Sequence, residues 1–341
     1  MRKLNLAVLL LTAVSLLAVS CHVDGGPADM QWNDFVQPFR HDLQREGYTL
    51  RYIDMGSGEP VFLLHGFASS TYCWNKNVKA LSDAGFRTVV VDLPGQGQTD
   101  VPPESFDPRV ENVAGEVLAL ADHLGIDRFS AVGASMGGGL TLFLSWNHAD
   151  RVIRSVVIDP ACFDQEKPWY LGLFTSPVVG SALAQFAGRW SVKSSLLDTV
   201  YDDDMVDDVF VDEYARPMAK PGYKAFLARL MDRFFSDRFR EMSESYDRIG
   251  VPMLILWGLE DKWVPPEFGP RLNALVPDSR YVGVEKCGHM PHLEKPEFVN
   301  PLLVEFLRPE PAPEPEIDQA APAGEEAAAG GTAPDAAIQE P

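Results

Sequence analysis

A serine at position 135 lies among small residues in the motif GASMGG, residues 133–138. An apolar run of strand length precedes the motif, and a run with helical periodicity follows it. The pattern G-x-S-x-G is typical of a sharp strand-to-helix turn that presents a strained serine and leaves no room for large neighbours. Such a serine acts as a nucleophile when a base takes its proton. The alternative is a glycine-rich turn with an incidental serine.

An acid and a base occupy suitable positions further along the chain. Asp261 follows the apolar run PMLILW, and His289 follows the last strand-like segment. The chain order Ser135, Asp261, His289 is the order that this kind of catalytic triad requires in proteins with a G-x-S-x-G turn. We expect Asp261 to orient His289, and His289 to deprotonate Ser135 and later protonate the leaving group.

Two alternatives to these residues remain open from the sequence. Asp159 also follows a strand-like run, VIRSVVID, and could supply the acid, although it could equally cap a turn. His292 lies three residues after His289 and is the alternative base.

The segments that must position these residues alternate between strand and helix patterns, which predicts a mostly parallel, twisted sheet with helices on both faces. Helical patterns interrupt this alternation in residues 162–247, which we interpret as a cap over the carboxyl ends of the strands. The expected strands are 48–55, 60–64, 86–92, 128–134, 152–159, 252–257 and 279–284. The expected helices are 72–84, 108–124, 136–148, 178–190, 223–242, 266–275 and 296–307.

Five motifs together resemble the α/β-hydrolase superfamily over about residues 48–307. They are HG at 65–66, DLPGQGQT at 92–99, the Ser135 motif, WGLED at 257–261 and GHMPHLE at 288–294. The resemblance implies the α/β-hydrolase fold and an oxyanion hole built from the backbone N–H groups of Phe67 and Met136. It implies loop-organising roles for His65, for Asp92 and for the two glycines at 95 and 97. The family often has histidine where this chain has Gln96.

The resemblance also narrows the reaction. Related haloalkane dehalogenases and epoxide hydrolases have aspartate at the nucleophile position, whereas this chain has Ser135. C–C bond hydrolases of the family share the Ser-Met-Gly-Gly turn but commonly carry tryptophan where this chain has Met290. We therefore predict a carboxylic ester hydrolase, esterase- or lipase-like, that forms an acyl-enzyme. The alternatives are a C–C bond or amide hydrolase with the same triad, a perhydrolase side reaction, and a non-catalytic envelope binding protein.

This chemistry requires no cofactor and no metal ion. We expect a small-molecule ester with an apolar acyl group as substrate, because the cap is rich in large apolar side chains. Most of these should form the core of the cap, and a few should contact the substrate. They are Trp169, Tyr170, Leu171, Leu173, Phe174, Phe186, Phe226, Phe234 and Phe235.

The N-terminus has the pattern of an export signal. Two basic residues precede an apolar run at 4–19, which is short for a membrane span. Small and apolar residues lead into Cys21, as in the lipobox of bacterial lipoproteins. We predict a signal peptide (1–20), a lipid anchor on Cys21 that attaches the protein to a bacterial membrane, and a tether (21–29). The alternatives are an uncleaved anchor, or cleavage with Cys21 as a bystander.

The remaining boundaries follow from composition. The hydrolase core would comprise residues 30–161 and 248–308, separated by the cap (162–247). Residues 309–341 are rich in Pro, Ala and Glu, which predicts a disordered acidic tail. Residues 198–213 and the tail hold eight acids each and no base, so they account for most of the net charge of −20. An acidic chain of this kind lacks the basic footprint of a nucleic-acid-binding protein.

Two further features leave the predicted chemistry unchanged. Residues 198–213 contain no glycine, unlike calcium loops, and we interpret them as an exposed acidic face with an apolar underside. Cys73, Cys162 and Cys287 match no metal-binding spacing, and either one disulfide or three buried thiols would fit them.

Overall fold

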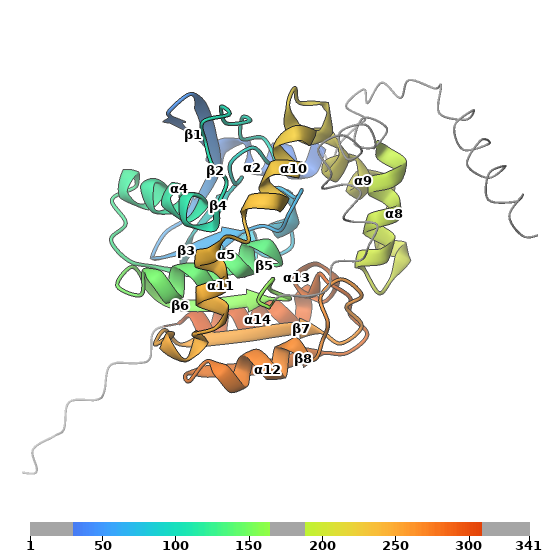
Figure 1. Cartoon of the computed structure of the whole chain (residues 1–341). Coiled ribbons are helices and arrows are strands. Elements are labelled where there is room, and N and C mark those ends of the chain that lie inside the picture. Colours follow the sequence, from blue (N-terminus) through green and yellow to red (C-terminus); the bar gives the residue numbers. More distant parts are fainter. Residues whose placement is uncertain (1–29, 164–187, 309–341) are drawn as a thin grey trace, which may run out of the picture. The chain divides into compact units, whose positions relative to one another are not determined.

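A computed structural model describes residues 30–163 and 188–308 of the chain, and Figure 1 shows their arrangement. These residues form a sheet of eight strands in the order β1-β2-β4-β3-β5-β6-β7-β8. The strands are β1 (Arg40–Arg45), β2 (Tyr48–Gly56), β3 (Glu59–Leu64), β4 (Phe86–Val91), β5 (Phe129–Ala134), β6 (Val152–Ile158), β7 (Met253–Gly258) and β8 (Ser279–Val284).

Within the described residues, the pairs β1–β2 and β2–β4 are antiparallel, and all the other neighbouring strands are parallel. Side chains of a strand alternate between its two faces. In β3, Phe62 and Leu64 join one apolar cluster, whereas Val61 and Leu63 join the other. All four are fully buried, so both faces of the sheet are covered. The predicted fold class, a mostly parallel α/β sheet with helices on both faces, is confirmed.

Helices from different parts of the chain cover these two faces. Residues of α4, α5 and α12 belong to one apolar cluster, and residues of α3 and α14 belong to the other. The α-helices are α2 (Met30–Val36), α3 (Val78–Asp83), α4 (Val110–His123), α5 (Met136–Asn147), α8 (Arg189–Thr199), α9 (Asp208–Ala215), α10 (Tyr223–Arg233), α11 (Asp237–Ser243), α12 (Phe268–Leu275), α13 (Pro291–Glu294) and α14 (Pro296–Leu307). The 3₁₀ helices are η1 (Gln37–Phe39), η2 (Thr71–Trp74), η3 (Asp203–Met205), η4 (Arg216–Ala219) and η5 (Tyr246–Arg248).

Two expected helices are each divided in the structure. The helix expected at 72–84 consists of η2 and α3, separated by a turn. Fully buried Asn77 lies in this turn and donates to His292 O at 2.9 Å and Asn300 Oδ1 at 2.7 Å. The helix expected at 223–242 is interrupted at Ser236, whose hydroxyl accepts the Phe239 N–H as the N-cap of α11. Ser236 thus satisfies an N–H group that the break in the helix leaves free, and Asn77 binds two groups outside the expected helix.

The described part of the insertion between β6 and β7 is helical, as the sequence indicates. The helix expected at 178–190 falls largely outside the described residues, and α8 begins at its end. Residues 198–213 show the expected apolar underside, with Val206, Phe210 and Val211 buried and six aspartates exposed. Asp207 caps α9 by accepting the Phe210 N–H at 2.8 Å.

Three sequence expectations concern thiols, termini and membranes. Cys73, Cys162 and Cys287 are buried free thiols, so the disulfide alternative is wrong for these residues. The signal peptide, Cys21, the tether and the acidic tail all lie outside the described residues. In the described ranges, no helix combines the length and the apolar character needed to cross a membrane.

Two glycines in helices give opposite predictions for the same substitution. A Cβ atom on Gly137 would lie 2.1 Å from Leu64 O, whereas a Cβ on exposed Gly115 of α4 would meet nothing within 4 Å. We expect Gly137→Ala to lower the free energy of unfolding by about 1–3 kcal/mol or more, because α5 must move away from β3. We expect Gly115→Ala to raise it by about 0.5–1 kcal/mol through helix propensity. Urea unfolding of both variants measures this; effects of the same sign would contradict the packing described.

Candidate active site

Ser135 occupies a strained turn between β5 and α5. Its backbone has φ 54° and ψ −117°, outside the regions that residues with side chains usually adopt. Hydrogen bonds hold this conformation: the Ser135 N–H donates to Ile158 O at 2.9 Å, and Ser135 O accepts the N–H groups of Gly139 and Ala161, both at 3.0 Å. A glycine-rich turn with an incidental serine would not account for a strained backbone conformation that hydrogen bonds hold at both the N–H and the C=O of Ser135. The turn places Ser135, which is partly exposed, at the carboxyl end of the sheet.

The loop after β3 lies against this turn. A Cβ atom on Gly66 would be only 3.2 Å from Ser135 Cβ, so the residue between His65 and Phe67 nearly touches the serine. The His65 ring has Nδ1 2.7 Å from Gly66 O, while Nε2 accepts the Leu93 N–H at 3.0 Å. Burial lowers the pKa of His65, which keeps the ring neutral. His65 therefore organises the loop, as the resemblance implies.

Side chains of the loop after β4 hold the loop after β3 in place through hydrogen bonds. Buried Asp92 accepts the N–H groups of Thr71 at 2.7 Å and Gln98 at 2.8 Å. The Gln96 side chain accepts the Ala68 N–H at 2.7 Å, one residue beyond Phe67. Glutamine thus holds the loop at the position where the family often has histidine.

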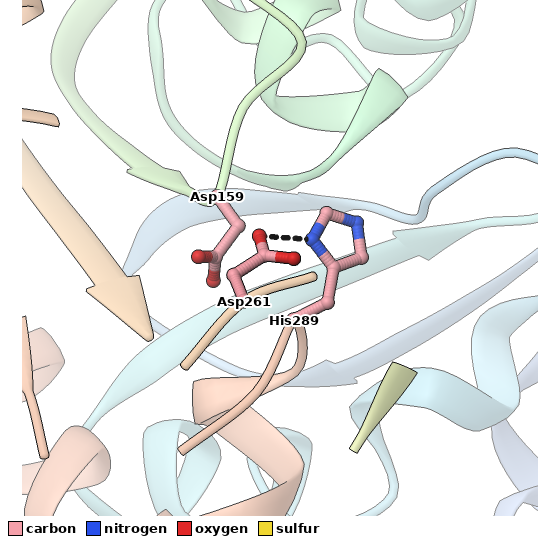
Figure 2. A group of neighbouring side chains, drawn as sticks. All are labelled: Asp159, Asp261 and His289. Carbon is pink, nitrogen blue, oxygen red and sulfur yellow. Dashed lines mark hydrogen bonds and ion pairs between the residues drawn. The ribbon is translucent and has the colours of Figure 1, made fainter. Parts of the chain in front are cut away.

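Asp261 and His289 form a buried pair, shown in Figure 2. His289 Nδ1 lies 2.6 Å from Asp261 Oδ2, and the side chains are 7% and 0% exposed. The other carboxylate oxygen, Oδ1, accepts the N–H groups of Trp263 at 2.7 Å and Val264 at 3.1 Å. These bonds fix the carboxylate, and the carboxylate fixes the ring. With Nδ1 occupied, Nε2 is the ring nitrogen that remains to exchange protons with a substrate or a nucleophile.

Asp159, the alternative acid, lies beside this pair but does not bind the histidine. Figure 2 shows its carboxyl group next to Asp261. Its Oδ1 accepts the Gly258 N–H at 2.9 Å. Complete burial, together with the charge of Asp261, raises the pKa of Asp159 well above its ordinary value. Asp159 also has a positive φ of 43°, and its bond to Gly258 joins it to the end of β7 instead of capping its own turn.

The carboxylates and the histidine of Figure 2 are also the one group of acids and histidines compact enough to hold a metal ion within residues 30–163 and 188–308. Their ligand atoms all lie within 4.8 Å of one another. Residues 198–213 form no such group there.

His292, the alternative base, is a packing residue. Its ring lies 4.6 Å from that of Trp74, and neither ring nitrogen has a hydrogen-bonding partner among the described residues. Burial, with a contribution from nearby His289, lowers the pKa of His292 to about 3.

A cavity of about 310 Å³ lies apart from these residues. Its walls come from η4 of the insertion, from the N-terminal strands and from the loop after β4, and none of Ser135, Asp261 and His289 lines it. Charged side chains of both signs face it: Arg40, Arg51, Asp92, Glu213, Arg216 and Lys220. Among the expected apolar residues of the cap, Phe226 and Phe234 are buried in the core and Phe235 is 37% exposed; the other six lie outside the described residues.

Two glutamates that support the loops were missed from the sequence. The Glu260 carboxylate accepts the Cys287 N–H at 2.9 Å, which joins the loop of Asp261 to the loop of His289. Glu294 accepts the N–H groups on both sides of His289. Both glutamates lie within motifs that carry the family resemblance, but the backbone groups that their carboxylates bind follow only from the loop geometry.

The buried carboxyl of Asp159 predicts a pH-dependent stability. Its pKa is raised in the folded state, whereas in the unfolded chain it ionises near pH 4. The stabilisation is therefore fully present below about pH 4 and is lost as the pH rises towards the folded-state pKa. Asp159→Asn keeps an oxygen for the Gly258 N–H and removes the titration. We expect wild type to lose up to about 1.4 kcal/mol per pH unit relative to Asp159→Asn across this window, measured by urea unfolding at pH 4–8. A constant difference between the two proteins would contradict it.

Comparison with known proteins places this geometry in a family. Residues 59–296 match the family model described as the alpha/beta hydrolase fold. A soluble epoxide hydrolase from Corynebacterium sp. is 26% identical over 294 residues, which cover 79% of this chain and 97% of the relative. A 2-hydroxy-6-oxononadienedioate/2-hydroxy-6-oxononatrienedioate hydrolase from Burkholderia vietnamiensis is 28% identical over 279 residues, covering 78% and 94%.

Among solved structures, a variant of the meta-cleavage product hydrolase CumD from Pseudomonas fluorescens superposes with a TM-score of 0.65 at 26% identity, covering 78% of this chain and 96% of that one. The sheet order, the strained serine turn and the buried Asp–His pair agree with the family match. The chain belongs to the α/β-hydrolase family.

Proposed function

We propose that this hydrolase is a serine enzyme that cleaves carboxylic esters through an acyl-enzyme, with Ser135, Asp261 and His289 as its triad. The observation that carries the proposal is the strained Ser135 turn at the same edge of the sheet as the 2.6 Å Asp261–His289 pair. A nucleophile on a turn of this kind, a base, and an acid that orients the base are the three parts that acyl transfer needs.

The reaction would begin when His289 Nε2 takes the proton of Ser135 and the Ser135 oxygen attacks the ester carbonyl. The backbone N–H groups of Phe67 and Met136 would bind the resulting oxyanion, and each such donor contributes on the order of 3 kcal/mol to the transition state. The protonated His289 would then donate its proton to the leaving alcohol. Water, activated by the same nitrogen, would release the acid and restore Ser135. Asp261 would stabilise the imidazolium throughout.

An apolar acyl group suits the surroundings of the histidine. Met290 follows His289 directly, and its sulfur accepts a hydrogen bond from the Tyr214 hydroxyl at 3.8 Å. The Tyr214 ring lies 4.9 Å from that of Phe210. The Trp263 ring stacks on the His289 ring with 6.3 Å between centroids. These neighbours favour esters with hydrocarbon acyl chains over charged ones.

C–C bond hydrolysis is the second candidate. The Burkholderia relative and the CumD structure carry names of that reaction class, and the Ser-Met-Gly-Gly turn agrees with it. Met290, where the C–C hydrolases commonly carry tryptophan, favours the ester proposal. Epoxide hydrolysis, the activity named for the Corynebacterium relative, is disfavoured because the resemblance associates it with aspartate at the position of Ser135.

A substrate panel tests the proposal. We expect the protein to hydrolyse p-nitrophenyl esters, with kcat/KM for these exceeding that for a ring-cleavage dienone or an anilide. Ser135→Ala should lower kcat by about 10⁴-fold or more, because removal of a triad nucleophile leaves only binding and oxyanion stabilisation. Ser243→Ala, far along the chain in α11, should retain wild-type rates and serves as the control.

The outcomes separate the alternatives. Undiminished turnover by Ser135→Ala would overturn the mechanism. A higher kcat/KM for the dienone than for the esters would show that the same triad catalyses C–C bond cleavage. A fluorophosphonate probe should label wild type and leave Ser135→Ala unlabelled. Failure to label wild type would support the non-catalytic binding protein.

We also propose that the protein is exported and anchored by lipid on Cys21. The support is the sequence pattern alone: two basic residues, the apolar run 4–19 and small residues before the cysteine. In a bacterial host, the wild-type protein should incorporate radiolabelled palmitate and should sediment with the membranes. Cys21→Ala should lose the label, while Cys73→Ala, which alters a buried thiol, should keep it. Equal labelling of all three proteins would refute the anchor.

A further inference from the structure

The loop that carries His289 is held almost entirely by groups from other segments. Four consecutive N–H groups, from residues 287–290, all have acceptors outside the loop. Glu260 takes the first, and Glu294 Oε1 takes the second and fourth at 2.9 and 3.3 Å. The third is the N–H of His289 itself, which donates to Thr199 O at 2.7 Å. Thr199 is the last residue of α8 and therefore belongs to the insertion.

Glu294 joins the loop that carries His289 to the insertion. Its second carboxylate oxygen, Oε2, accepts the Tyr201 N–H at 2.8 Å. One carboxylate thus binds the N–H groups of both residues that flank His289 and also binds the insertion two residues beyond Thr199. Three N–H bonds to one ionised group are charge-assisted and stronger than bonds to a neutral acceptor.

The approach of the two segments leaves no space between them. A Cβ atom on Gly288 would lie 2.4 Å from Thr199 O and 2.9 Å from Tyr201 N. Val200, between these two residues, is 1% exposed. The segment 199–201 therefore lies directly against the histidine loop, and any movement of this segment must move the loop or break its bonds.

We propose that Glu294 is a positioning residue that couples the segment 199–201 of the insertion to His289, so that the insertion sets the position of the base. The inference rests on the proposed function in assigning His289 as the base. Asp261 fixes the ring through Nδ1, and Glu294 fixes the backbone that carries the ring. When the segment 199–201 is displaced, His289 loses its Thr199 acceptor and the triad loses its alignment.

Glu294→Gln tests the coupling while keeping the size of the side chain. An amide offers one acceptor and places an NH₂ donor against N–H groups, so one of the two attachments must break. A misplacement of about 1 Å costs up to about 100-fold in rate, so we expect kcat for a short p-nitrophenyl ester to fall about 10- to 100-fold. KM should stay within about threefold, because the acyl site is intact. Glu297→Gln, exposed in the first turn of α14, should match wild type.

A second pair of variants acts from the insertion and leaves Glu294 in place. Tyr201→Pro removes the N–H donor, and Tyr201→Ala, its reference, keeps the donor and removes the same half-exposed ring. We expect kcat of Tyr201→Pro to fall about 10-fold or more relative to Tyr201→Ala. The double variant of Glu294→Gln with Tyr201→Pro should be little slower than either single variant, because both break one attachment.

A readout that needs no substrate separates this proposal from the proposed function. In Ser135→Ala protein, the low-field proton resonance of His289 Nδ1–H bonded to Asp261 should be sharp. It should broaden or shift when Glu294→Gln or Tyr201→Pro is added, and should be unchanged by Glu297→Gln. An unaltered resonance with Glu294→Gln, whatever the rates, would overturn the coupling. Failure of wild type to cleave esters would overturn only the proposed reaction.

Discussion

Parallel strands impose the constraint on which the rest of this structure depends: their carboxyl ends all lie at one edge of the sheet. Strands β5, β6 and β7 are neighbours: β5 and β6 end directly before Ser135 and Asp159, and β7 ends three residues before Asp261. Residues far apart in the chain are thus brought to one edge of the sheet by the strands themselves. The 2.6 Å bond between Asp261 and His289 then needs only one short loop after β8. The rigidity of the sheet allows a strained serine turn to persist beside it.

The sequence predicted the parts of the molecule that have strong local signals. Strands such as β3 and β7 are short apolar runs bounded by turn residues, and their alternation with helices was enough to predict a parallel sheet. Strand β1 was missed because Arg40–Arg45 has a single buried apolar residue, Leu43, and charged neighbours suited to an edge strand. The division of two expected helices depended on where the Asn77 and Ser236 side chains find partners. Periodicity does not contain that information.

The same distinction applies to the candidate site. The types and order of Ser135, Asp261 and His289 could be predicted because each follows a recognisable strand. The relation of Asp159 to Asp261 could not, since both follow strands equally well and only the three-dimensional arrangement shows which carboxylate meets the imidazole. Glu260 and Glu294 were missed for a similar reason. Their carboxylates bind backbone groups, which carry no signature in the sequence of the partner segment.

The three buried cysteines have a consequence for where this chain can fold. Burial raises the pKa of the thiols of Cys73, Cys162 and Cys287, and only the thiolate form reacts readily with oxidants or other disulfides. No cross-link among them has to form for the sheet to assemble, and none is available to form wrongly once it has. The described part of the fold therefore requires no disulfide among these three cysteines, so it can assemble under reducing conditions.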